Sequence, residues 1–224
     1  MYKDKSILAI ITARGGSKRL PNKNVMNLAG KPLIAWTIEA AKKSKYIDRI
    51  ILSSENRGII EIAKKYGCEV PFIRPSCLST DESSSTDVVI HAINSLDVLY
   101  DYTILLQPTT PLRTWHEIDE CIGKCISENS KAIASVAKVH KPQIYHTVKN
   151  GKLTPLFKNS SLENNPVELY IENGALYMFD TKHFVKVKTL PIKKSTCYVM
   201  PKEHSIDIDT ILDFKLAEYL ANKS

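Results

Sequence analysis

The apolar run from Ile7 to Ala13 constrains the fold most, because it carries no charged residue and presents apolar side chains on both faces of an extended chain. Such runs are typical of strands in parallel sheets that helices cover on both sides. Further strands are expected at 49–53, 69–73, 102–106, 132–139 and 196–200, and helices at 33–43, 57–66, 88–99, 115–127 and 211–220. This alternation predicts a three-layer α/β fold with a mostly parallel, twisted sheet.

A loop rich in glycine and cations follows that first strand directly. From Ala13 to Asn24 the sequence is A-R-G-G-S-K-R-L-P-N-K-N. Gly15 and Gly16 let the backbone approach a ligand closely and turn its N–H groups toward it. The pattern is neither a Walker A loop nor a dinucleotide fingerprint. It predicts a polyphosphate site, with a solvated basic loop as the alternative; the cations that would offset phosphate charge are Arg14, Lys18, Arg19 and Lys23.

Composition narrows the classes of function. The 224 residues are 43% hydrophobic and 25% charged, which suits one globular domain, and no apolar run approaches the ~20 residues that cross a bilayer. With no signal peptide at the N-terminus, we expect a cytoplasmic protein with no membrane partner and with five free cysteines. The net charge of +7 implies anionic partners, but the scattered cations favour a small polyanion over nucleic acid.

Two carboxylates near the end of the chain are candidates for a metal site. Asp207 and Asp209 alternate with Ile206 and Ile208, so an extended segment turns both carboxylates to one side. Such a pair can bind Mg²⁺ while phosphate oxygens complete its coordination. One of the two could instead cap the helix that follows. In combination with a triphosphate loop, the magnesium site is favoured.

Two further segments are less regular. The run at 79–87, S-T-D-E-S-S-S-T-D, precedes a helix, and helix capping accounts for part of its hydroxyl and carboxylate groups. From 141 to 166 the alternation lapses, and Asn150-Gly151 predicts a hairpin. We therefore predict a single domain, 1–224, with an inserted segment at 141–172 that extends from the core.

Segments along nearly the whole chain, in order, resemble the cytidylyltransferases that activate nonulosonic (sialic-type) acids. Besides the glycine-and-cation loop they are G-K-P-L-I-A-W-T-I-E-A-A, V-P-F-I-R-P, T-D-E-S-S-S, L-L-Q-P-T-T-P-L-R, N-G-A-L-Y and Y-V-M-P-K-E-H-S-I-D-I-D-T-I-L-D-F. The resemblance implies a Rossmann-like fold of the nucleotide-diphospho-sugar transferase type. It also implies Mg²⁺-dependent transfer of CMP from CTP to the anomeric hydroxyl of a nonulosonic acid, and a homodimer in which segment 141–172 borders the partner's site.

The resemblance also implies roles at the matching positions. Arg14 and Lys18 would stabilise the triphosphate and the leaving pyrophosphate, and Asp209 would help to remove the acceptor's proton or act as a metal ligand only. The metal pair is Asp207 and Asp209. The sugar acid would contact Gln107, Lys141 and Tyr177. The nucleotide would contact Ala13, Arg14, Gly15, Gly16, Ser17, Lys18, Lys23, Asn24, Arg74 and Ser85.

The chain departs from the family pattern ahead of N-G-A-L-Y. Relatives typically have an arginine pair where 160–166 is S-S-L-E-N-N-P, and an arginine where Ile171 stands. Because these cations are missing, and Lys141 replaces them only in part, legionaminic- and pseudaminic-type acids are candidate substrates alongside N-acetylneuraminate. The alternatives are a CMP-Kdo synthetase and, from another class, a non-catalytic nucleotide-binding homologue, which an assay of pyrophosphate release would distinguish from the enzyme.

Overall fold

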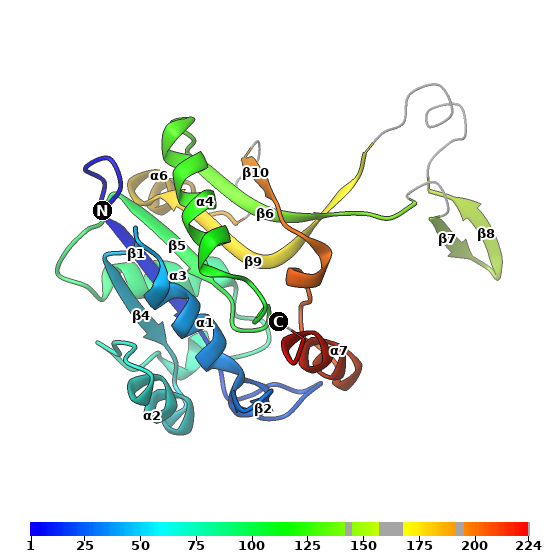
Figure 1. The fold of residues 1–224 in the computed structure, drawn as a ribbon, viewed down its shortest axis with the longest axis horizontal. Helices are drawn as coiled ribbons and strands as arrows, with labels where there is room; N and C mark the ends of the chain where they lie inside the picture. Colours follow the sequence, from blue (N-terminus) through cyan, green and yellow to red (C-terminus); the bar gives the residue numbers. More distant parts are fainter. Residues whose placement is uncertain (142–144, 157–167, 191–194, 224) are drawn as a thin grey trace.

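The computed structural model describes residues 1–141, 145–156, 168–190 and 195–223. Its main feature is a six-stranded sheet of order β10-β6-β9-β5-β1-β4 (Figure 1). The strands are β1 (Ile7–Thr12), β4 (Arg49–Ser53), β5 (Tyr102–Leu106), β6 (Ala132–Lys138), β9 (Tyr170–Asp180) and β10 (Thr196–Val199). Among these strands β9 alone is antiparallel to its neighbours, so the predicted mostly parallel sheet is confirmed.

Helices cover both faces of the sheet (Figure 1). They are α1 (Leu33–Lys43), α2 (Arg57–Lys65), α3 (Ser85–Asn94), α4 (Trp115–Ser127), α6 (Thr181–Val187) and α7 (Ile211–Ala221). Ile7, Ala9 and Ile11 of β1 pack with α1, α2 and α4, whereas Leu8 and Ile10 pack with α3 and α6. Because alternate side chains of one strand enter two cores, the run that contains them has to be apolar at consecutive positions.

Helix α7 packs away from both faces of the sheet, in a third cluster. Its residues Phe214 and Ala217 pack against Leu20 and Leu28, which lie between β1 and α1, and against Leu33, the first residue of α1. The end of the chain therefore lies against the residues that follow the first strand. Short elements complete the description: η1 (Lys23–Val25), β2 (Asn27–Leu28), β3 (Lys31–Pro32), η2 (Ser76–Leu78) and η4 (Lys202–His204).

Two predicted elements differ from the structure. The strand expected at 69–73 is wrong: Glu69 forms only an isolated bridge with Ile51, and Pro71 then lacks the N–H that a ladder needs. The helix expected at 88–99 begins three residues earlier, at Ser85, because the Ser84 hydroxyl caps it by accepting from Asp87 N at 3.0 Å. It also ends earlier, at Asn94.

The inserted segment contains the predicted hairpin. Strands β7 (His146–Lys149) and β8 (Lys152–Pro155) pair on either side of Asn150 and Gly151, whose φ angles are +51° and +74°. We call residues 145–156 the arm, and Figure 1 shows it set apart from the sheet. Its Val148 and Leu153 are each 70% exposed. Residues 160–166, on which part of the substrate prediction rests, lie outside the described residues.

The thiols are free in the described structure, as expected from the sequence. Burial raises the pKa of Cys68 and of Cys125 to about 12 and raises that of Cys121 as well, so these three thiols stay protonated at neutral pH. Cys77 and Cys197 are exposed. Within the described ranges, no helix has the length and apolar character that crossing a membrane requires.

Candidate active site

A cleft of about 620 Å³ opens at the carboxyl edge of the parallel strands. Four chain segments line it: the loop after β1, the stretch from Arg74 to the start of α3, the loop after β5, and Asp209 ahead of α7. These segments are far apart in sequence. The loops after β1 and β5 lie together because those two strands pair in the sheet, and the packing of α7 against Leu20 and Leu28 brings Asp209 to them. The predicted site residues that line the cleft are Arg14, Ser17, Lys18, Lys23, Asn24, Arg74, Ser85, Gln107 and Asp209.

The cationic loop and the carboxylate near the end of the chain meet in this cleft. Asp209 Oδ2 accepts from Arg19 Nη1 at 2.6 Å, and its Oδ1 lies 3.2 Å from Lys23 Nζ. The buried Lys23 ammonium also donates to the backbone oxygen of Ile208. The described lining residues comprise five cations and two carboxylates, Asp81 and Asp209, which leaves a net charge of +3. That balance suits a polyanionic ligand.

Glu55, which the sequence analysis did not identify, organises the loop after β1. Its Oε2 accepts from Arg74 Nη2 at 2.7 Å, and its Oε1 accepts from the Gly15 N–H at 2.7 Å. Arg74 is 4% exposed and also donates to Ala13 O at 3.0 Å. Burial alone raises the pKa of Glu55, but the hydrogen bonds from Arg74 and Gly15 outweigh it and hold that pKa below the ordinary 4.5.

The two glycines differ from each other, and only Gly15 departs from the predicted role. The Gly15 N–H binds Glu55, so it does not point into the open cleft, and neither glycine lines the cleft. A Cβ at Gly15 would overlap the side-chain amide of Asn56, the residue that caps α2, whereas one at Gly16 meets no described atom within 4 Å. Gly15 is therefore required by packing, and the Gly16 backbone stays open to a ligand.

Asn24 presents an unused acceptor at the cleft. Its Nδ2 donates to Arg14 O at 3.0 Å, but its Oδ1 is buried without a partner among the described residues. A buried acceptor in that state is costly unless a ligand or water donates to it. The site is therefore suited to a ligand that carries an amine or hydroxyl beside its phosphates.

Asp81, also missed by the sequence analysis, bridges two cations of the loop after β1. Its Oδ1 lies 2.6 Å from Arg14 Nη2, and its Oδ2 lies 2.5 Å from Lys18 Nζ. These two hydrogen bonds, Lys18 first, lower the pKa of Asp81. In the sequence, Asp81 is one of several polar residues in a capping-type run, so nothing there distinguishes it from its neighbours.

The Q-P-T-T-P-L-R and N-G-A-L-Y segments meet at one end of the cleft. Gly174 has φ +71°, and a Cβ there would lie 3.1 Å from Gln107 Oε1 and 3.6 Å from Asp207 Oδ2. The pairing of β9 with β6 shifts register here, and the Ser135 hydroxyl donates to Asn173 Oδ1 at 2.6 Å. This irregularity turns Gly174 toward Gln107 and Asp207, so the two segments share a surface.

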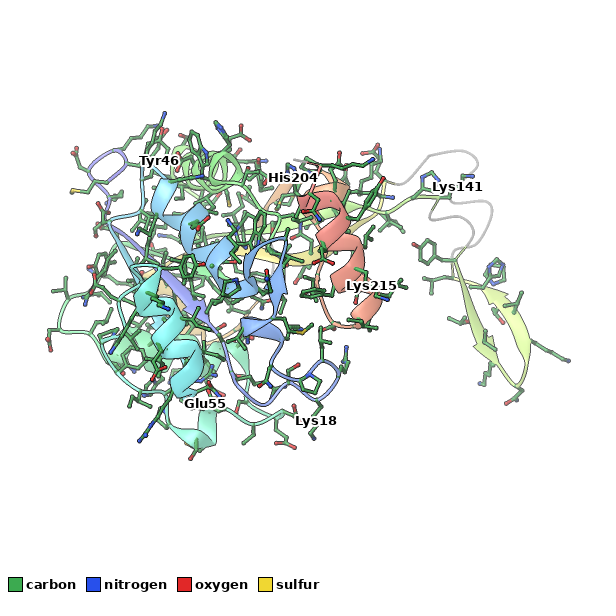
Figure 2. The ribbon with its side chains drawn as sticks, turned by 60° about the horizontal axis from the view of Figure 1, so that its bottom comes forward. Lys18, Tyr46, Glu55, Lys141, His204 and Lys215 are labelled. Carbon is green, nitrogen blue, oxygen red and sulfur yellow. The ribbon has the colours of Figure 1, made fainter. Side chains whose placement is uncertain are left out.

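Tyr177 and Lys141, the other predicted contacts of the sugar acid, do not line this cleft. The Tyr177 hydroxyl donates to Glu172 Oε2 at 3.2 Å, and burial together with Glu172 raises the pKa of that hydroxyl. Figure 2 shows Lys141 near the arm, away from Lys18. Contact of Tyr177 and Lys141 with a substrate therefore stays a prediction.

Buried Arg113 fixes the loop that carries Gln107. Its Nη1 donates to Ala175 O at 2.8 Å, and its Nη2 donates to Thr37 Oγ1 at 2.9 Å. Burial lowers the pKa of the Arg113 guanidinium to about 10, so it remains charged at neutral pH. The loop after β5 is thereby tied both to β9 and to α1.

Asp207 and Asp209 carry the carboxylate oxygens that a hard cation such as Mg²⁺ prefers; of the two, Asp209 lines the cleft and Asp207 does not. Partial desolvation raises the pKa of Asp207, although this residue keeps access to solvent. The charges of Asp209 and Asp213 raise that pKa further, whereas a hydrogen bond with Thr109 lowers it. The described residues include no cluster of three or more His, Cys, Asp or Glu that could hold a metal. A hard cation here would therefore need phosphate oxygens as further ligands, and a triphosphate supplies them.

Comparison with known proteins identifies the family of this chain. A cytidylyltransferase family model matches residues 8–223. The pseudaminic acid cytidylyltransferase of Campylobacter jejuni is 35% identical over 95% of this chain and 95% of its own length. The CMP-N,N'-diacetyllegionaminic acid synthase of Legionella pneumophila is 36% identical over 96% of this chain and 95% of its own length. The N-acylneuraminate cytidylyltransferase of Escherichia coli is 36% identical over 97% of this chain and 52% of its own length.

Solved structures of low identity share the fold. A CMP:2-keto-3-deoxy-manno-octonic acid synthetase complexed with CTP superposes with a TM-score of 0.76 at 14% identity, covering 98% of this chain and 99% of that one. A 4-diphosphocytidyl-2C-methyl-D-erythritol synthase from Anaerococcus prevotii gives 0.70 at 16% identity, covering 97% and 99%. The nucleotide-diphospho-sugar transferase type of fold is thereby confirmed. With the family match over nearly the whole chain, the protein belongs to the cytidylyltransferase family.

Proposed function

We propose that this cytidylyltransferase transfers CMP from CTP to the anomeric hydroxyl of a nonulosonic acid. The observation that carries the proposal is the meeting of the loop after β1 with Asp209 in one cationic cleft. The names of the relatives support the acceptor class, since they act on pseudaminic, legionaminic and N-acylneuraminic acids.

The nucleoside and the triphosphate have separate parts of the cleft. Arg14, Lys18 and Lys23 would hold the phosphates, because they line the cleft as a cationic group. Asn24, which donates to Arg14 O, and Arg74, which donates to Ala13 O, would hold the cytidine. The unused Asn24 Oδ1 can accept from a nucleoside hydroxyl or amine.

In the reaction, the acceptor oxygen forms a bond to the α-phosphorus, and the bond from that phosphorus to the pyrophosphate oxygen breaks. Arg14 and Lys18 would stabilise the charge that develops on the leaving group. When bound at Asp207 and Asp209, Mg²⁺ supplies neutralisation of phosphate charge. Asp209 would take the hydroxyl proton; if Asp209 serves only as a metal ligand, the proton would leave to solvent. The acceptor would lie at the end of the cleft formed by Gln107 and Gly174.

The assay that tests this proposal measures pyrophosphate release with CTP, Mg²⁺ and each candidate sugar acid, including Kdo. Asp209→Asn is expected to lower kcat/KM by about 100-fold or more, whereas Asp97→Asn, at an exposed site outside the cleft, keeps the wild-type rate. Calorimetry gives a readout independent of turnover: Asp207→Asn should weaken Mg²⁺ binding in the presence of CTP. Tight CTP binding without turnover of any sugar acid would instead identify a non-catalytic homologue.

Within the nonulosonic acids, we propose a legionaminic- or pseudaminic-type substrate. The support is Ile171, which is 61% exposed at a position where the family pattern has an arginine. Steady-state kinetics with the three acids should give the highest kcat/KM for one of these two, and Ile171→Arg should raise the use of N-acetylneuraminate. A wild-type preference for N-acetylneuraminate would overturn this choice.

We also propose a homodimer in which the arm borders the partner's site. Support comes from the apolar residues of the arm, which the rest of the described chain leaves uncovered: Tyr145, Val148, Leu153 and Leu156 are all exposed. A cytoplasmic location and the absence of nucleic-acid and membrane partners stay predictions, which fractionation and binding assays with DNA, RNA and vesicles would check.

A further inference from the structure

We propose that Asp81 is a positioning residue that occupies the triphosphate site between turnovers and competes with the phosphates for Arg14 and Lys18. The proposal rests on the proposed CTP site. It adds a residue whose negative charge, at first sight, opposes the binding of a polyanion.

The geometry at Asp81 is that of a phosphate substitute. One carboxylate oxygen lies 2.6 Å from Arg14 Nη2 and the other lies 2.5 Å from Lys18 Nζ. A phosphate group held between these two cations would present two oxygens in the same way. Asp81 itself lines the cleft, so its carboxylate stands in the space that a ligand enters.

A tight turn holds Asp81 beside the cations. The Ser83 hydroxyl accepts from Thr80 N at 3.1 Å, lies 3.0 Å from Thr80 Oγ1 and donates to Cys77 O at 3.1 Å. These bonds close the turn at 80–83 around Asp81. The carboxylate therefore remains near Arg14 and Lys18 after a nucleotide has displaced it, and it repels the bound phosphates.

The other carboxylate of the cleft has a different explanation. Asp209 pairs with Arg19 and Lys23, and the metal site proposed at Asp207 and Asp209 accounts for it. No such role applies to Asp81, whose ion pairs among the described residues are with the two cations assigned to the phosphates. Its effect is twofold: it keeps Arg14 and Lys18 directed into the empty cleft, and it takes them back as pyrophosphate departs.

The test compares ligand binding by the full chain and its Asp81→Asn variant, using calorimetry with pyrophosphate, CTP and CMP. Removing the competing charge should tighten pyrophosphate and CTP binding by about 3- to 10-fold, the range expected for two partly exposed ion pairs. CMP, which lacks the β- and γ-phosphates, should change by less than about twofold. In kinetics, inhibition by pyrophosphate should strengthen by the same factor as its binding.

Two variants serve as controls. Glu82→Gln removes the same charge from the next residue, which does not line the cleft, and should leave all three affinities unchanged. Asp81→Glu keeps the charge and should stay close to wild type. If Asp81→Asn does not fold by circular dichroism, Asp81→Ser takes its place.

Three results would overturn the proposal. Unchanged or weaker pyrophosphate binding in the folded neutral variant shows that Asp81 does not compete, while the proposed function stands if the wild type binds CTP. An equal tightening in Glu82→Gln assigns the effect to net charge alone. A wild-type chain that binds neither CTP nor pyrophosphate removes both the inference and the proposed function.

Discussion

Gly174 is the residue at which the backbone conformation and the proposed acceptor site coincide. Its φ of +71° lies in the left-handed region, and an added Cβ would approach Gln107 Oε1 at 3.1 Å. Gly174→Ala should therefore cost roughly 1 kcal/mol of unfolding free energy and displace Gln107. We expect a raised KM for the sugar acid with little change in CTP affinity, measured by steady-state kinetics and calorimetry. Gly30→Ala, in the turn between β2 and β3, shares the positive φ, meets no described atom within 4 Å and should leave the KM unchanged.

Glu55 makes the folding stability of the protein depend on pH in the acid range. Its pKa is lower in the folded chain than the ordinary 4.5, because the hydrogen bonds from Arg74 and Gly15 outweigh burial. Its contribution to stability is therefore complete above pH 4.5 and is lost as the pH falls from 4.5 through the folded pKa. Urea unfolding across this range should show a shallower decline for Glu55→Gln than for the wild type. An identical decline in both would contradict the assignment.

Some residues of the site could be found from a local sequence pattern, whereas others have roles that depend on partners far along the chain. Arg14, Lys18 and Lys23 could be identified from sequence because one contiguous loop carries them after a recognisable strand. The roles of Glu55 and Asp81 depend on ion pairs that span 19 and 67 residues, to Arg74 and Arg14 respectively. No local pattern encodes such a pair, so only the folded chain reveals it.

Two helices have the same kind of N-terminal cap, but only one of these caps also contacts a residue of the candidate site. Thr114 caps α4 and Thr210 caps α7 with the same reciprocal pattern, in which an acidic side chain three residues later binds back to the cap. Asp213 of the second box also accepts from Asp209 N at 3.1 Å. Thr114→Ala should cost about 1 kcal/mol and lower Tm by ~2–4 °C without affecting CTP binding. Thr210→Ala should cost a similar amount and also weaken CTP binding with Mg²⁺; equal CTP affinity in both variants would contradict this coupling.

Among the elements, periodicity located the strands of the sheet core and most helices, but it did not give strand direction. The direction of β9 depends on where the chain re-enters the sheet after the arm, which the apolar pattern of 173–180 does not encode. The strand expected at 69–73 failed for a local reason, since Pro71 interrupts the ladder after one bridge.

At the scale of the whole molecule, the arm exposes apolar side chains on one of its faces. Val148 and Leu153 are paired across the hairpin and share one face, whereas Thr147 and Thr154 share the other. Leu153→Asp should convert the proposed dimer into a monomer, because it buries a charge in an apolar contact. Light scattering gives the mass, and Thr154→Asp on the opposite face is the matched control. A wild-type chain that is already monomeric would disprove the dimer.

The antiparallel direction of β9 has a topological consequence. Since β6 runs parallel to β5, it ends at the edge of the sheet where the cleft lies, and β9 starts from that same edge. The chain between β6 and β9 must therefore leave the sheet and return to it at this edge. Insertions or deletions in this stretch can therefore lengthen or shorten a surface beside the proposed acceptor site without shifting the register of the core, which makes it the natural place in the chain for new sugar specificities to arise.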